Sequence, residues 1–282
     1  MTTINADAAA GTAGLPDGRD IRAAFFDIDG TLTSFVTHVV PDSTVEALHR
    51  LQERGVKVFI CTGRAPSHMA VVLDTIPVRF DGIVGLNGQY CFDDSGYVES
   101  SSLDPDDVRT ISAWLDAHPD VVANFCERDY VYFNQVTDAM RATWESLGKT
   151  APKVFVDDPH ARIGDHATFQ VSPYVSVEQE REIESLCRNV KGVRWHPDFT
   201  DLIPADGGKP EGMKRFMRRY GWTREQTIAF GDGGNDATML EFAGIGVAMG
   251  NATEPARRAA DYVTDDVDHD GILNALTHFG VL

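Results

Sequence analysis

Phe25-Phe26-Asp27-Ile28-Asp29-Gly30-Thr31-Leu32 is an apolar stretch that ends abruptly on two carboxylates one residue apart. The large apolar side chains of residues 23–26 predict a short buried strand. Ligands of α/β sheets bind at the carboxyl ends of strands, so Asp27 and Asp29 stand where chemistry is expected. Gly30 allows the chain to turn sharply there. Taken alone, the stretch fits a solvated Asp-Gly turn equally well, and the remainder of the chain decides between the two interpretations.

The flanking sequence alternates between strands and helices. Apolar runs at 56–60 and 82–86 predict further strands, and helices are expected over 44–54 and 66–73. After residue 204 the same alternation resumes and continues to the end of the chain. Strands separated by single helices imply parallel βαβ units, so we expect an α/β fold with a Rossmann-like parallel-sheet core.

The segment between these two halves has a different pattern. The turn signal at 93–96 separates two short apolar strands, and amphipathic helices are expected over 106–117 and 177–187. Hairpins mixed with helices predict an α+β module inserted into the α/β domain. The predicted organisation is a disordered leader at 1–20, a core made of 21–88 and 204–282, and an inserted module at 89–203.

Composition and charge exclude several classes of protein. The formal net charge of −18 over 282 residues disfavours nucleic-acid and anionic-membrane partners. No apolar run approaches the roughly 20 residues needed to span a bilayer. The four cysteines lie far apart without a C-x-x-C pair, which argues against a zinc knuckle and a disulfide framework. We therefore expect a cytoplasmic protein, monomeric or homodimeric.

Polar clusters follow four apolar or glycine-rich segments, and in a parallel sheet all four would face the same edge. They are Asp27 with Asp29, Thr62 with Gly63, Lys209 after a glycine pair, and Asp232 with Asn235 and Asp236. Each cluster alone fits an ordinary solvated loop. The glycine-rich run after residue 230 lacks the third glycine of a dinucleotide-binding loop, because Asp236 stands there and an acid repels pyrophosphate.

These residue types suit a metal-dependent reaction on a phosphate group. Lys209 supplies a compact cation for one phosphate oxygen, and the Thr62 hydroxyl can donate a hydrogen bond to another. Mg²⁺ prefers oxygen ligands and needs only one or two carboxylates beside the substrate phosphate. Asp27 and Asp232 are the natural ligands, with Asp236 placed to orient a metal-bound water.

The four clusters, in this order and spacing, resemble the motifs of the haloacid dehalogenase-like (HAD) phosphohydrolase superfamily. The inserted module and the Asn87-Gly88 step before it look like the type IIB cap subgroup, often called Cof-like hydrolases. The resemblance implies that Asp27 is the nucleophile and that Asp29 acts first as general acid and then as base. It further implies phosphate or substrate binding by Thr62, Gly63, Lys209 and Asn235, and Mg²⁺ binding by Asp27, Asp29, Asp232 and Asp236.

The expected function is a Mg²⁺-dependent phosphatase of small phosphomonoesters, such as sugar phosphates or related metabolites, acting through an aspartyl-phosphate. Asp29 must then be protonated when the substrate binds. A phosphomutase of the same fold and a non-catalytic sensor of a phosphorylated ligand remain as alternatives. The sequence leaves the role of Arg64 open, and it does not select among the polar cap residues Glu127, Arg128, Tyr130, Arg162, His166, His196 and Asp198.

Overall fold

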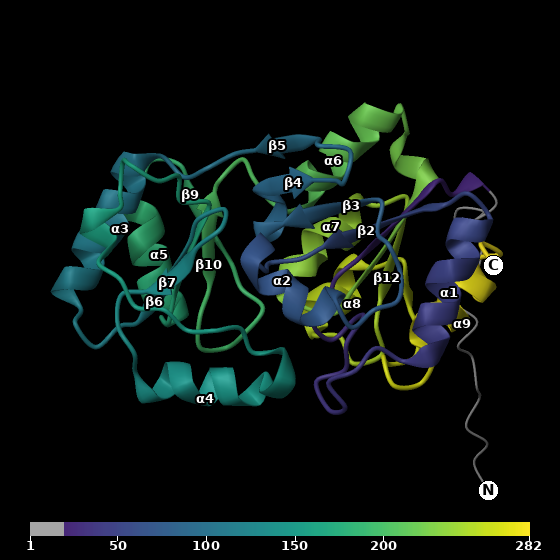
Figure 1. Ribbon diagram of the computed structural model, residues 1–282, viewed down its shortest axis with the longest axis horizontal. Helices are drawn as coiled ribbons and strands as arrows, with labels where there is room; N and C mark the ends of the chain where they lie inside the picture. The colour runs from purple at the N-terminus through teal and green to yellow at the C-terminus, as the bar shows by residue number, and fades with distance from the viewer. Residues whose placement is uncertain (1–19) are drawn as a thin grey trace, which may run out of the picture.

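The computed structural model describes residues 20–282, so the leader predicted at the N-terminus falls, except for Asp20, outside the described residues. Two lobes lie side by side, each built around its own β-sheet (Figure 1). No helix in the described range combines the length and the apolar character that crossing a membrane requires.

The first lobe contains an eight-stranded sheet in the order β13-β12-β11-β1-β2-β3-β4-β5. The strands from β13 to β3 are parallel. Their bounds are β1 Ala23–Phe26, β2 Lys57–Cys61, β3 Gly82–Gly85, β11 Thr227–Gly231, β12 Ile245–Ala248 and β13 Tyr262–Val263. The parallel-sheet core expected from the alternating pattern is confirmed, with β1 near its centre.

Helices cover both faces of this sheet, which is why its central strands are almost continuously apolar. On one face lie α1 (Asp42–Glu53), α2 (Pro66–Leu73) and α9 (Gly271–His278), packed against side chains such as Phe26 and Ile60. The other face is covered by α6 (Lys209–Tyr220), α7 (Ala237–Phe242) and α8 (Glu254–Ala259). The alternation of Phe25 and Phe26 between the two layers fixes β1 between them.

The hairpin at the start of the segment 89–203 belongs to the core sheet and not to the inserted module. Strands β4 (Tyr90–Phe92) and β5 (Val98–Ser100) pair antiparallel with each other, and β4 pairs with β3. The sequence signal for a hairpin was right, but the assignment of these residues to the module was wrong. A hairpin pattern reports local pairing and does not tell which sheet the hairpin extends.

The second lobe, which we call the cap, contains a five-stranded sheet in the order β7-β6-β8-β10-β9 with antiparallel neighbours. Its strands are β6 Ala123–Cys126, β7 Val131–Phe133, β8 Gln170–Pro173, β9 Val190–Val193 and β10 Asp201–Pro204. Helices α3 (Pro105–Ala117) and α5 (Val177–Leu186) contribute apolar side chains to the core on one face of the sheet. Helix α4 (Asp138–Ser146) lies at the lower edge of this lobe in Figure 1.

The inner face of the cap sheet is polar. Asn124 alternates with Phe125 on β6, and Gln170 and Ser172 alternate with Val171 on β8, so the apolar side chains join the cap core and the polar ones point away from it. This polar face and the core lobe together line a cavity that also contains Asp27. Apart from the hairpin β4–β5, the expected extent of the cap, up to residue 203, remains a prediction.

Candidate active site

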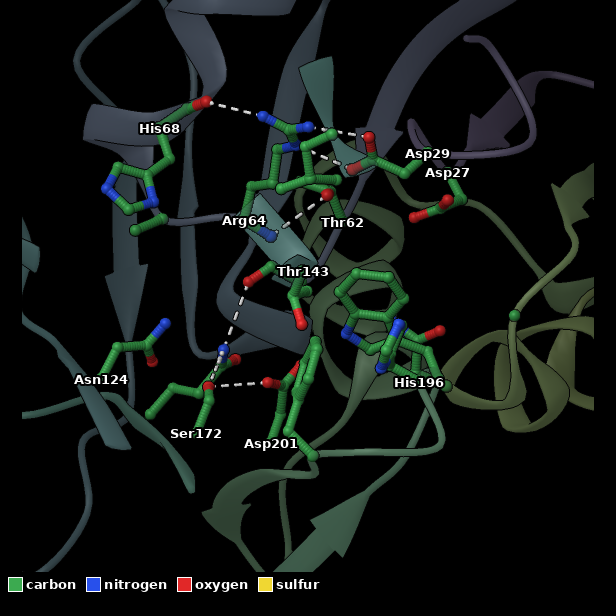
Figure 2. Close-up of a pocket in the computed structure, with 18 of the residues that line it drawn as sticks. Asp27, Asp29, Thr62, Arg64, His68, Asn124, Thr143, Ser172, His196 and Asp201 are labelled. Atoms are coloured by element: carbon green, nitrogen blue, oxygen red, sulfur yellow. Dashed lines mark hydrogen bonds and ion pairs between the residues drawn. The ribbon is translucent and has the colours of Figure 1, made fainter. Parts of the chain in front are cut away.

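The polar clusters expected at the strand ends meet at the carboxyl edge of the core sheet. Asp27 directly follows β1, Thr62 follows β2, Asp232 follows β11, and Lys209 begins α6. All four residues are buried. Figure 2 shows Asp27, Asp29 and Thr62 on one side of a cavity, with Ser172 and Asp201 from the cap on the other.

Three carboxylates form a compact cluster. Asp27, Asp232 and Asp236 each place a carboxylate oxygen within 4.8 Å of the other two. Burial raises the pKa of Asp27 to about 7 against the lowering effect of the Lys209 ammonium, and it raises the pKa of Asp232 well above its usual value. Three acids held this closely in a low-dielectric site repel one another, so a cation is needed to keep them ionised together.

Lys209 supplies part of that positive charge. Its side chain is completely buried, and its ammonium donates to Asp27 Oδ1 at 2.7 Å and to Asp236 Oδ1. Burial lowers the pKa of Lys209, but the two carboxylates more than offset this, so its pKa lies above its usual value. The lysine therefore stays charged at the centre of the site.

The loop after β11 is shaped by its own acids. Asp236 Oδ2 accepts hydrogen bonds from the backbone N–H groups of Asp232 at 3.0 Å and Gly233 at 2.8 Å. Asp232 Oδ1 accepts a hydrogen bond from Thr31 at 2.9 Å. Gly30 has φ +89° and a Cβ there would lie 2.2 Å from Asp232 Oδ2, so only glycine permits this approach of the two strand ends.

Asp29 lies outside the acidic cluster. Arg64 forms a two-point ion pair with it, donating from Nε to Oδ2 at 2.7 Å and from Nη2 to Oδ1 at 2.8 Å. The third nitrogen of the Arg64 guanidinium, Nη1, donates to the backbone carbonyl oxygen of His68 (Figure 2). The Asp29 carboxylate is thus committed to Arg64, and its predicted place among the metal ligands finds no support from its side chain.

The remaining predicted residues line the same cavity. Thr62 accepts a hydrogen bond from the backbone N–H of Arg64 at 3.1 Å, which leaves its hydroxyl proton available to a ligand. Asn235 donates to Asn87 Oδ1 at 3.1 Å. Gly63 also lines the cavity, and a Cβ there would lie 3.1 Å from the amide of Asn87.

A polar network joins the cap to this core site. Asp201 on β10 accepts hydrogen bonds from Asn87 at 2.9 Å and from Ser172 at 2.7 Å. Burial raises the pKa of Asp201 to about 6. Because Asn87 also contacts Asn235, one chain of hydrogen bonds runs from the cap sheet to the loop that carries Asp236.

The cavity between the lobes has a volume of about 420 Å³. Its core side contains Asp27, Asp29, Thr62, Arg64, Asp232 and Asn235, and its cap side contains Asn124, Thr143, Trp144, Gln170, Ser172, Tyr174, Trp195, His196, Phe199 and Asp201. The acids of the core lobe and the side chains of the cap therefore line one cavity, as expected of a small-molecule site.

Sequence reasoning missed most of the cap side of the cavity. Of the seven polar cap residues considered, only His196 lines it. Glu127 and Arg162 instead form a two-point ion pair with each other, at 2.7 Å for both contacts. The aromatic residues between 174 and 199 carry no spacing signal of a site, and helix α4 and strand β8 were not predicted at all.

Comparisons with known proteins agree with this geometry. Residues 24–276 match the family model described as haloacid dehalogenase-like hydrolase. The putative phosphatase YkrA of Bacillus subtilis is 31% identical over 93% of this chain and 99% of its own length. The structure of the HAD subclass IIB sugar phosphatase BT4131 superposes with a TM-score of 0.83 at 34% identity, covering 93% of this chain and all of the other. The structure of BT1666 from Bacteroides thetaiotaomicron, a HAD phosphatase, superposes with a TM-score of 0.83 at 34% identity, covering 96% of this chain and all of the BT1666 chain.

The chain belongs to the haloacid dehalogenase-like hydrolases. It is a HAD phosphatase of the Cof-like, subclass IIB type, and so a phosphoric monoester hydrolase. The family suggests small phosphate esters as substrates, and its phosphatases generally use a divalent metal ion.

Proposed function

We propose that this protein is a Mg²⁺-dependent phosphatase that hydrolyses small phosphomonoesters, sugar phosphates or related metabolites, through an aspartyl-phosphate intermediate. The observation that carries the proposal is the position of Asp27, which shares one cavity with a second acid, Asp29, and contacts the buried ammonium of Lys209. The name of BT4131, a sugar phosphatase, supports the substrate class.

In the first step Asp27 attacks phosphorus. A bond forms between an Asp27 carboxylate oxygen and phosphorus, and the bond from phosphorus to the ester oxygen breaks. Lys209 and the Thr62 hydroxyl stabilise charge on the phosphoryl oxygens, and Asp29 gives its proton to the departing alkoxide.

In the second step Asp29 takes a proton from a water molecule, which attacks the phosphorus of the aspartyl-phosphate. The new bond to the water oxygen releases Asp27 as a free carboxylate and completes the hydrolysis. Because one residue serves as acid and then as base, Asp29 must be able to face the ester oxygen. Its ion pair with Arg64 must therefore loosen or turn during the cycle.

The acidic cluster fits a magnesium ion. Its donors are carboxylate oxygens from Asp27 and Asp232, with Asp236 nearby, and hard oxygen ligands of this kind suit Mg²⁺. Bound there, Mg²⁺ would polarise the phosphoryl group and shield it from the acids that surround it. Both oxygens of Asp236 already accept hydrogen bonds, which favours a role in orienting a metal-bound water.

The composition of the cavity argues against the mutase alternative. A phosphomutase handles a substrate with two phosphates in one cycle and needs cationic groups for both. Among the described residues that line the cavity, the cap contributes no lysine or arginine. We further propose a cytoplasmic location, since the cysteines Cys61, Cys91, Cys126 and Cys187 are all free thiols.

Release of inorganic phosphate from a panel of phosphomonoesters, with and without EDTA, tests the proposal. We expect Mg²⁺-dependent release that disappears in Asp27→Asn, because an amide cannot form the covalent intermediate. Retained turnover in that variant would overturn the covalent scheme. Binding of phosphate esters without any release, by folded and metal-loaded protein, would favour the sensor alternative.

A further inference from the structure

We propose that the leaving group of the substrate carries a planar, uncharged ring, held by a wall of aromatic side chains on the cap. We call this wall the aromatic wall and define it as Trp144, Tyr174, Trp195, His196 and Phe199, which all line the cavity that contains Asp27. The inference rests on the proposed phosphatase function and narrows its substrate class from any small phosphomonoester to one with a ring beyond the phosphorylated carbon.

Four members of the aromatic wall form a connected cluster, whereas the ring of Trp144 packs against Phe133 and lines the cavity separately. Phe199 is 6% exposed and lies at the centre of the cluster. Trp195 meets it edge-on with ring centroids 4.9 Å apart, His196 stacks on it at 5.0 Å, and Tyr174 is tilted against it at 5.2 Å. Trp195, His196 and Tyr174 are only half-buried, so part of each ring faces the cavity.

The aromatic wall packs against the loop after β11, which carries Asp232 and Asp236. The Trp195 side chain lies near enough to Asp201 to counteract part of the rise in the pKa of that carboxyl, and Asp201 is itself held by Ser172 and Asn87. A Cβ on Gly233 would lie 3.3 Å from Cβ of Trp195, so the indole begins beside the loop that carries the site acids. A rigid aromatic surface binds a flat ring with little loss of side-chain entropy.

The charge of the cavity favours an uncharged leaving group. On the cap side the Asn124 amide can hydrogen-bond to a ring substituent but cannot balance an anion. Gln170 and Ser172 are also uncharged, and they already hydrogen-bond within the protein. Burial lowers the pKa of His196, so its imidazole is neutral at pH 7. Arg64, on the core side, forms its ion pair with Asp29.

The size of the cavity also favours a ring-bearing substrate. A volume of about 420 Å³ lies within the range of roughly 300–1,000 Å³ that holds drug-sized ligands, which is large for a three-carbon phosphate ester. A quaternary ammonium leaving group would also bind aromatic faces. A carboxylate would strengthen such binding, but Asp201, the carboxylate among the described cap residues that line the cavity, already accepts hydrogen bonds from Asn87 and Ser172.

Two matched pairs of substrates test the proposal. Uridine 5′-monophosphate and ribose 5-phosphate share the phosphorylated carbon and differ by the planar base. Benzyl phosphate and cyclohexylmethyl phosphate differ mainly in the planarity of the ring. We expect kcat/KM to be about 10-fold to 100-fold higher for the planar member of each pair, which is the range that stacking of one base on aromatic side chains supplies.

Variants connect this preference to the aromatic wall. Trp195→Leu should reduce the ratio of kcat/KM between the planar and the non-planar substrate at least about fivefold, mainly by raising KM for the planar one. Phe155 is an exposed aromatic residue of the cap outside the cavity, so Phe155→Leu should leave this ratio unchanged. Trp144→Leu on α4 provides a second variant should Trp195→Leu fail to fold. Quenching of tryptophan fluorescence by uridine in Asp27→Asn gives a readout that needs no turnover.

The outcomes separate the inference from the function on which it rests. Phosphate release from both members of each pair at equal kcat/KM would overturn the inference and leave the phosphatase intact. Faster release from phosphocholine than from any ring substrate would also overturn it, since the aromatic wall would then select a cation. Absence of release from every ester would overturn the proposed function, and quenching by uridine would still report whether the ring binds.

Discussion

The guanidinium of Arg64 binds both carboxylate oxygens of Asp29 at 2.7 and 2.8 Å, which fixes the proposed acid and base from the end of the neighbouring strand. Only 10% of the Arg64 side chain and 16% of the Asp29 side chain are exposed. Planar two-point pairing of this kind specifies orientation as well as position. Arg64 is therefore a positioning residue that holds Asp29 at the cavity in the resting site, from where Asp29 can turn to the ester oxygen once the pair loosens.

Replacing Arg64 should slow the transfer of a proton to a poor leaving group. In Arg64→Ala we expect kcat for an alkyl phosphate to fall about 10-fold to 100-fold, part of the ~10²–10⁴ that general acid catalysis supplies. For p-nitrophenyl phosphate, whose leaving group needs no proton, the decrease should be several times smaller. Steady-state kinetics with both substrates checks this, and equal losses for the two would show that Arg64 acts only through folding.

Removing the buried cation should destabilise the protein. Lys209→Met leaves Asp27 and Asp236 buried without their shared partner, which costs about 3–5 kcal/mol in the free energy of unfolding. We expect the melting temperature to fall in EDTA and to recover partly with Mg²⁺, which would supply positive charge to the same carboxylates. Thermal unfolding with and without Mg²⁺ measures this. If Mg²⁺ restored none of the lost melting temperature, the idea that Mg²⁺ and Lys209 both supply positive charge to these carboxylates would be contradicted.

Magnesium should stabilise the folded protein through the acidic cluster. At 100 times its dissociation constant, a ligand that binds only the native state adds about 2.7 kcal/mol to stability. We expect Mg²⁺ to raise the melting temperature of the wild type and to have little effect on Asp232→Asn, which loses one carboxylate of the cluster. Glu241→Gln, an exposed acid on α7, serves as the control, and an unchanged response in Asp232→Asn would exclude Asp232 as a ligand.

The buried carboxyl of Asp201 should make stability depend on pH. Burial raises its pKa from 3.8 to about 6, so between these values the folded protein holds a proton that the unfolded chain releases. The contribution to stability is complete below pH 3.8 and is lost as pH rises through about 6, by up to about 3 kcal/mol. The stability difference between wild type and Asp201→Asn, from denaturant unfolding, should change in this window, and a constant difference would contradict the prediction.

Gly30 should tolerate no side chain. Gly30→Ala combines a positive φ of +89° with a Cβ that would overlap the Asp232 carboxylate, so we expect activity to fall by more than about 100-fold. Gly55→Ala is the matched control, because Gly55 has φ +77° but no atom within 4 Å of the added Cβ. Similar activity in the two variants would show that the contact with Asp232 is unimportant.

The core of the fold could be predicted because its signals are local and redundant. The central parallel strands are apolar runs such as residues 57–61, buried on both faces, and β1, β2 and β11 are each followed along the chain by a helix. The strand ends that carry Asp27, Thr62 and Asp232 then meet because all parallel strands end at one edge. The parallel arrangement of the strands was therefore enough to predict that Asp27 and Asp232, about 200 positions apart, lie close together.

The cap was harder to predict, because its elements depend on tertiary contacts. Strand β8 (Gln170–Pro173) contains polar residues and a proline, so its sequence shows no strand pattern, yet it pairs with β6 and β10 on either side. Helix α4 is short and has mixed polarity. An ion pair of Arg64 with a neighbouring acid was one of the roles left open, but its partner Asp29 was not predicted, since a sequence does not reveal which acid an arginine will meet.

The division of the cavity between two sheets has a consequence for how such a protein changes over generations. The residues proposed to perform the phosphoryl chemistry lie at the edge of the parallel sheet, whereas side chains on the opposite side of the cavity, such as Trp195, come from the cap. A duplicated gene can therefore acquire a new substrate through a few substitutions on one lobe, without disturbing Asp27 or its neighbours. Substitutions in the cap can therefore change which alcohol is accepted, while the residues of the core sheet that carry out the proposed reaction stay the same.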